Sequence, residues 1–114
     1  THRMSSAASD VYKRQDFSNL NLSFQEFPSD RSKIQDIARE VCNKGGFLGT
    51  VFNAANEIAV ESFLNKKIKF NEIYEVIYRT FDKNIVSNEV TIESINEVDA
   101  QTRIHAQKVV KSFA

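Results

Sequence analysis

The chain has 114 residues, enough for one domain with a hydrophobic core but short for a cofactor enzyme that carries its own nucleotide-binding fold. Fifteen basic and fifteen acidic side chains balance, so no net charge favours nucleic acid or an anionic membrane as a partner. No apolar run approaches the roughly 20 residues that a membrane-spanning helix requires, and a single cysteine cannot form an internal disulfide.

Residues 1–15 are polar and rich in serine and alanine, without the apolar core of a signal peptide. We expect this segment to be disordered. Part of it, SSAASDVYKRQ, resembles translated sequencing-adapter sequence rather than a basic targeting tail. We therefore interpret residues 1–15 as a non-native leader and leave them out of the predicted fold.

Residues 16–27 alternate between apolar and polar side chains, with Leu20, Leu22 and Phe24 on one side. This period of two predicts a half-buried strand. No second strand-like run follows, so the strand is an orphan whose sheet lies elsewhere. The segment is interpreted as the end of a preceding domain.

Amphipathic helices are expected throughout residues 28–114. Pro28, Ser29 and Asp30 are typical of a helix start, and Gly45 and Gly46 of a helix end. The expected helices cover residues 30–44, residues 50–64, residues 71 to about 84, a short turn from 92 to 98, and a last helix capped by Asp99. The predicted fold is all-α, a bundle of four or five helices.

Four polar residues lie together on the second of these helices, opposite its apolar face: Asn53, Asn56, Glu57 and Glu61. Their amides and carboxylates could reach a ligand or a neighbouring domain. They could equally be hydrated, and we favour a non-catalytic role. Two carboxylates one turn apart lack the further oxygen ligands that a hard cation needs.

The remaining polar candidates have structural explanations. Cys42 is expected to face the core of its helix, where a thiol behaves as a small apolar group. His105 has no second histidine or nucleophile to form a relay with it. The lysines at positions 66, 67 and 69 follow a helix end, where cations complement the helix dipole.

The motif NAANE at 53–57, followed by A-V-x-x-F-L and by K-I-K-F-N-E-I, resembles the C-terminal part of the 1-deoxy-D-xylulose 5-phosphate reductoisomerase family. Supporting similarities are DFSNLNLSF at 16–24, GGFLGTVF at 45–52 and V-D-A with Arg103 near the C-terminus. The similarity covers residues 16–114. The stretch FPSDRSKIQ departs from the family pattern where many relatives carry a Pro-Cys or similar pair.

The resemblance implies a bacterial, cytoplasmic α/β enzyme that rearranges and reduces its substrate with NADPH and a divalent cation, Mg²⁺ or Mn²⁺, and that forms a homodimer. The family's nucleotide and metal motifs lie upstream of this sequence. No catalytic, cofactor-binding or metal-binding residue is carried over, and the piece alone is expected to be inactive. Residues 28–114 would be the C-terminal helical domain.

By the same resemblance, Asn53, Asn56 and Glu57 would form a polar seam between this domain and the preceding catalytic and NADPH-binding domains. An alternative remains open. The chain could instead be a stand-alone helical interaction module that binds a partner through the second helix.

Overall fold

The computed structural model describes residues 16–81 and 89–114. The predicted leader and the predicted end of the third helix near position 84 lie outside the described residues. Within them the chain forms two short 3-10 helices and four α-helices, and the all-α prediction is confirmed. Their bounds are η1 (Phe17–Asn19), η2 (Ser29–Arg31), α2 (Lys33–Lys44), α3 (Leu48–Leu64), α4 (Glu72–Thr80) and α5 (Ile92–Lys111).

The first α-helix, α2, begins after the 3-10 turn that follows Pro28 and ends where Gly45 takes a φ of 61°. That left-handed conformation carries little cost for glycine. Within α2 only Ile37 is fully buried. The prediction that Cys42 faces the core is wrong: its side chain is exposed, because neighbouring helices cover little of α2 and only Ile37 is fully buried.

The central helix, α3, starts two residues before the predicted Thr50 and ends as predicted at Leu64. Its last turn is closed by two backbone bonds, in which Lys67 N–H donates to Ser62 and Lys66 N–H donates to Phe63. This is the Schellman arrangement, and Lys66 holds a φ of 58° where glycine is usual. The buried face of α3 comprises Leu48, Val51, Ala54, Ala55, Ile58, Ala59 and Ser62.

The last helix, α5, is continuous from Ile92 to Lys111. The predicted break before Asp99 is therefore wrong, because no glycine or proline interrupts the backbone hydrogen bonds in this stretch. The cap lies at Thr91 instead. Its hydroxyl accepts from the backbone N–H of Ser94, whose own hydroxyl accepts from the backbone N–H of Thr91. The reciprocal pair is a capping box.

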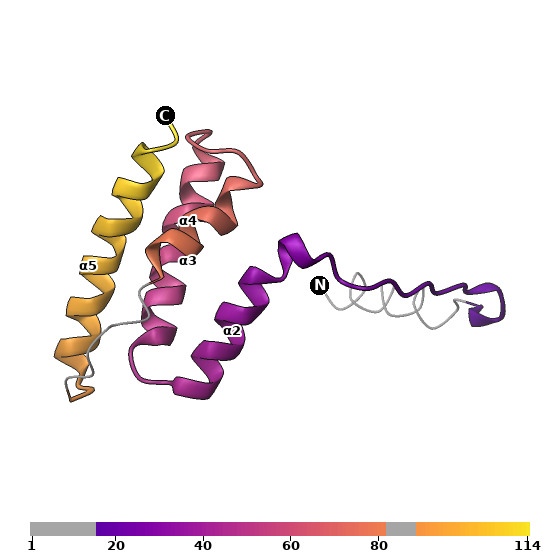
Figure 1. Ribbon diagram of the computed structural model, residues 1–114, viewed down its shortest axis with the longest axis horizontal. Coiled ribbons are helices and arrows are strands. Elements are labelled where there is room, and N and C mark those ends of the chain that lie inside the picture. Colours follow the sequence, from indigo (N-terminus) through magenta and orange to yellow (C-terminus); the bar gives the residue numbers. More distant parts are fainter. Residues whose placement is uncertain (1–15, 82–88) are drawn as a thin grey trace, which may run out of the picture.

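The strand predicted over residues 16–27 is not formed in this structure. A 3-10 turn occupies Phe17–Asn19, and residues 20–27 continue without helix or strand. A strand requires a partner strand to accept its backbone hydrogen bonds, and the described residues provide none. In Figure 1 this segment runs away from the helices.

The helices pack with α3 at the centre. Figure 1 shows α3 between α5 and α2, with α4 lying across it. Contacts join α4 to the other three α-helices, whereas α2 and α5 do not contact each other within the described residues. The main core combines α3, α4 and α5 through Ala55, Ala59, Val76, Ile77, Ala106 and Val110, and a smaller cluster joins α2 to α3 through Ile37, Leu48, Val51 and Phe81.

Candidate functional site

The side of α3 turned away from its buried face carries the predicted polar stripe. Asn53 and Glu57 are exposed and Asn56 is half-buried. Helical geometry places Val60 and Leu64 on the same side, and 70% of Leu64 is accessible to solvent. We call these five residues the uncovered face of α3, because α2, α4 and α5 pack against its other sides.

The fourth member of the stripe, Glu61, points elsewhere. It lines a pocket between α3 and α5 together with Gln107 and Lys111. The structure therefore splits the predicted stripe in two. Asn53, Asn56 and Glu57 stay together on the uncovered face, and Glu61 belongs to a different surface.

A hydrogen-bonded chain crosses from the uncovered face to α5. Asn53 Nδ2 donates to Glu57 Oε1 at 2.9 Å, and Arg103 Nη2 donates to Glu57 Oε2 at 2.6 Å. Arg103 also donates to Asp99 one turn earlier on α5, from Nε to Oδ2 at 2.7 Å. Arg103 thus joins residues 46 positions apart. Sequence periodicity gave no signal for that pairing.

The same hydrogen bonds shift the pKa values of Glu57 and Arg103 so that both side chains stay charged. Hydrogen bonding from Arg103, then from Asn53, holds the pKa of Glu57 below its ordinary value. Hydrogen bonds to Asp99 and Glu57 raise the pKa of Arg103. Glu57 therefore stays a carboxylate at neutral pH, whereas a general acid there would need its pKa raised. The arrangement favours a structural role over acid–base catalysis.

Asn56 differs from Asn53 in having no hydrogen-bond partner among the described residues. Its side chain is half-buried beside α3's apolar flank. Both the carbonyl oxygen and the NH₂ group of such an amide remain available. Asn56 lies at the edge of the uncovered face of α3. Its unpaired amide is therefore suited to form a hydrogen bond with a backbone group of another segment that packs on this face.

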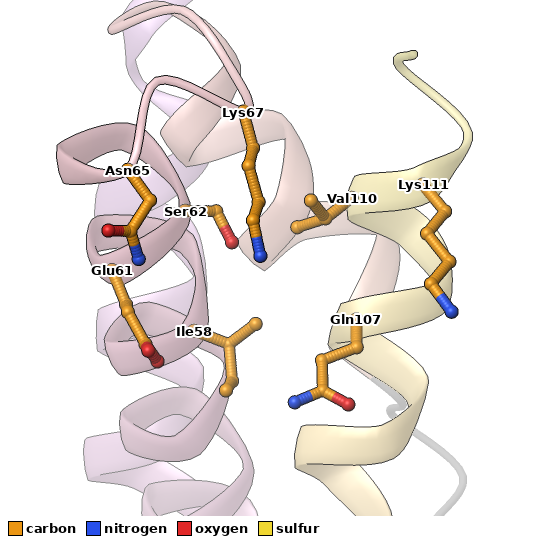
Figure 2. A pocket seen from close by; sticks show the side chains of 8 residues that line it. All are labelled: Ile58, Glu61, Ser62, Asn65, Lys67, Gln107, Val110 and Lys111. Atoms are coloured by element: carbon orange, nitrogen blue, oxygen red, sulfur yellow. The ribbon is translucent and has the colours of Figure 1, made fainter.

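A pocket of about 270 Å³ lies between the C-terminal ends of α3 and α5. Figure 2 shows Lys67 reaching down toward Ile58 while Gln107 points in from α5. The lining residues are Ile58, Glu61, Ser62, Asn65, Lys67, Gln107, Val110 and Lys111. Sequence reasoning placed Lys67 at a helix end but did not find the pocket, because Gln107 and Lys111 come from a distant helix.

The pocket lining includes the hydroxyl of Ser62, but no hydrogen bond joins it to Glu61 or Lys67, the two residues there that could act as a base. Its two ammonium groups lie at helix C-termini, where cations complement the partial negative charge of the last carbonyls. The other candidates are apart: Cys42 is exposed on α2 and His105 is exposed on α5. Within residues 16–81 and 89–114, no group of three or more His, Cys, Asp and Glu side chains is placed to hold a metal ion.

None of the helices that the structure describes is long and apolar enough to span a membrane. The longest, α5, carries charged residues along its length, with Lys108 and Lys111 in its last turn. Its buried residues are Thr102, Ala106 and Val110.

Comparison with known proteins identifies the fold. The sequence model of the family described as "DXP reductoisomerase C-terminal domain" matches residues 2–105. The chain belongs to this family. The resemblance carried by NAANE and its flanking residues is therefore confirmed, and the helical bundle is the fold of a reductoisomerase C-terminal domain.

Relatives of this domain are full-length reductoisomerases. The 1-deoxy-D-xylulose 5-phosphate reductoisomerase of Shewanella frigidimarina is 41% identical over 81% of this chain and 23% of its own length. The enzyme of Psychromonas ingrahamii is 34% identical over 83% of this chain and 24% of its own. The chain thus spans about a quarter of the length of the relatives it matches.

A solved structure gives the same result. The reductoisomerase of Zymomonas mobilis in complex with NADPH matches with a TM-score of 0.70 and 33% identity, covering 86% of this chain and 26% of that one. Residues 28–114 make up about three quarters of the 114-residue chain. Since the match covers more than that share, it also includes residues before position 28.

Proposed function

We propose that this chain is the C-terminal helical part of a 1-deoxy-D-xylulose 5-phosphate reductoisomerase, with the domain beginning at about Pro28. The parent enzyme would convert 1-deoxy-D-xylulose 5-phosphate to 2-C-methyl-D-erythritol 4-phosphate in the non-mevalonate pathway of isoprenoid synthesis. The observation that carries the proposal is the likeness, in sequence and in fold, to an enzyme solved with NADPH.

The parent's cofactors would be NADPH and a divalent cation, Mg²⁺ or Mn²⁺. The described residues of this chain do not fit a metal site, since no acidic or histidine cluster converges in them. We therefore assign neither cofactor to this domain. Both would be held by the preceding domains, in a homodimeric enzyme of the bacterial cytoplasm.

The domain's own role in this proposal is to pack against those preceding domains. The uncovered face of α3 supports that role, because it combines two apolar side chains with the unpaired amide of Asn56. Asn53, Asn56 and Glu57 would form the polar seam of the contact. The Arg103–Glu57 ion pair would hold α5 and α3 in register beneath it.

The test is a chimera in which residues 16–114 replace the matching C-terminal quarter of the Zymomonas mobilis enzyme. We expect the chimera to oxidise NADPH with 1-deoxy-D-xylulose 5-phosphate in the presence of Mg²⁺, and the truncated Zymomonas enzyme to be inactive. A chimera that folds and binds NADPH but does not turn over the substrate would contradict the proposal. It would favour the stand-alone interaction module instead.

The polar seam is tested in the same chimera with Asn56→Ala. Loss of a partner for a buried polar group costs about 1–3 kcal/mol, so we expect the melting temperature and the turnover of the chimera to fall. Glu61→Ala is the matched control, on the same helix but outside the uncovered face, and we expect it to change neither. Equal behaviour of the two variants would remove Asn56 from the seam.

A further inference from the structure

The pocket between the C-terminal ends of α3 and α5 contains an unpaired hydroxyl group. Ser62 is only 7% exposed, and its Oγ has no hydrogen-bond partner in the part of the chain that the structure describes. Inside a helix such a hydroxyl commonly bonds the carbonyl one turn back, as the hydroxyl of Thr102 bonds Val98. Figure 2 shows the Ser62 side chain turned toward α5 instead. The hydroxyl is therefore available to a molecule bound in the pocket.

Lys67 reaches into the same pocket because of the turn that closes α3. Lys66 takes a φ of 58°, and the N–H of Lys67 donates to the carbonyl of Ser62 at 2.8 Å. The chain therefore reverses direction, and Figure 2 shows the Lys67 side chain running back between α3 and α5. Within residues 16–81 and 89–114 its ammonium group forms no ion pair, so its charge is free to attract an anion.

The α5 wall of the pocket adds an amide and a second cation. Gln107 points its amide toward α3, and Lys111 lies one turn further along α5, at the outer edge. Glu61, on α3, supplies a carboxylate, and neither lysine of the lining forms an ion pair with it. The two lysines outnumber this carboxylate, so the lining carries one excess positive charge. That balance favours a ligand with a single negative charge.

Apolar side chains form the floor of the pocket. Ile58 and Val110 line it, and both are buried members of the core shared by α3, α4 and α5. The volume of about 270 Å³ is slightly below the roughly 300–1,000 Å³ of pockets that hold drug-sized ligands. The pocket is therefore suited to a small molecule that has a short hydrocarbon body and one charged end.

We propose that this pocket binds a small aliphatic carboxylate. The carboxylate group of the ligand accepts hydrogen bonds from Lys67, Ser62 and the NH₂ group of Gln107. Its hydrocarbon chain lies on Ile58 and Val110. The site joins α3 to α5 and uses no residue of the uncovered face of α3, so it does not depend on the contact proposed with the preceding domains.

The experiment is a titration of the isotope-labelled 114-residue chain with butyrate at constant ionic strength, followed by the backbone amide signals in NMR spectra. We expect saturable shifts at Ser62, Lys67 and Gln107 and a millimolar dissociation constant, because so small a ligand makes few contacts. Lys67→Gln should weaken binding about fivefold, and Ser62→Ala should weaken it as well. Lys69→Gln removes the same charge from a residue outside the pocket lining and should leave the affinity unchanged.

Two further probes test the class of ligand. Butylammonium has the same hydrocarbon body with the opposite charge, and inorganic phosphate carries negative charge without that body, so we expect both to bind more weakly than butyrate. Equally tight binding of either probe, or shifts that do not saturate with butyrate, would overturn the inference. So would an equal loss of affinity in Lys67→Gln and Lys69→Gln. An inactive chimera would refute the proposed function but leave this result intact, because the titration uses the 114-residue chain alone.

Discussion

Two buried threonines differ in what their hydroxyl groups contact. Thr102, on α5, donates from Oγ1 to the carbonyl of Val98 at 2.7 Å. Thr80, at the end of α4, is 4% exposed and its Oγ1 has no partner within the described residues. A buried hydroxyl that has lost its water without gaining a partner is destabilising.

Thr80→Val should therefore stabilise the protein, because valine keeps the shape and removes the unpaired hydroxyl. We expect the free energy of unfolding in urea to rise by about 1 kcal/mol. Thr102→Val is the matched control and should leave it unchanged or lower it, since there a hydrogen bond is lost. A lower stability for Thr80→Val would mean that its hydroxyl is paired in solution.

For single residues, the sequence predicts which side of a helix a side chain faces, because that depends only on the spacing of nearby positions. Helical spacing puts Ala54 and Ala55 of NAANE away from the polar stripe, and both are fully buried. Cys42 was placed wrongly, because periodicity gives the direction of a side chain but not whether a neighbouring helix is there to cover it. The pairing of Glu57 with Arg103 joins two helices, and no local pattern encodes it.

Among the helices, α5 depends most visibly on its first turn. Thr91 and Ser94 satisfy each other's backbone N–H groups, which have no carbonyl partner at a helix start. Ile92, next in the chain, is exposed and so adds no packing at this end. The cap is therefore the main local restraint on the first turn.

Thr91→Ala removes that restraint. We expect the free energy of unfolding to fall by about 1 kcal/mol, and the loss should be visible in urea denaturation. Thr91→Ser keeps the accepting oxygen and should restore nearly all of it. If alanine and serine behave alike, the capping box contributes nothing in solution.

A secondary-structure element could be predicted from the sequence when its backbone hydrogen bonds are formed within the element. Amphipathic spacing and end signals were enough for α2, α3 and the start of α4, because a helix pairs its own backbone groups. A strand does not, and residues 16–81 and 89–114 contain no partner for the strand that the alternation over residues 16–27 predicted. The supposed break in α5 came from reading Asp99 as a cap, although its carboxylate bonds Arg103.

The whole domain is not held together evenly. α3, α4 and α5 share one apolar cluster, and the Arg103–Glu57 pair adds a link between α3 and α5. α2 joins them through Ile34, Ile37 and Val41, which pack in or against the two apolar clusters, and through Lys33, whose Nζ lies 5.0 Å from the ring centre of Tyr78. It also connects residues 16–31 to the rest of the domain, so its attachment governs how that segment is placed.

We therefore expect α2 to open separately from the other helices. Native-state hydrogen exchange should show the amides of α2 exchanging at least about tenfold faster than those in the middle of α3, because local opening exposes less apolar surface than global unfolding. Ile37→Ala should speed exchange in α2 alone. Val76→Ala, in the shared core, should speed it in α3, α4 and α5 as well. Equal protection of α2 and α3 in the unmodified protein would mean instead that the domain unfolds as one unit, and that α2 positions the segment before it as rigidly as the core does.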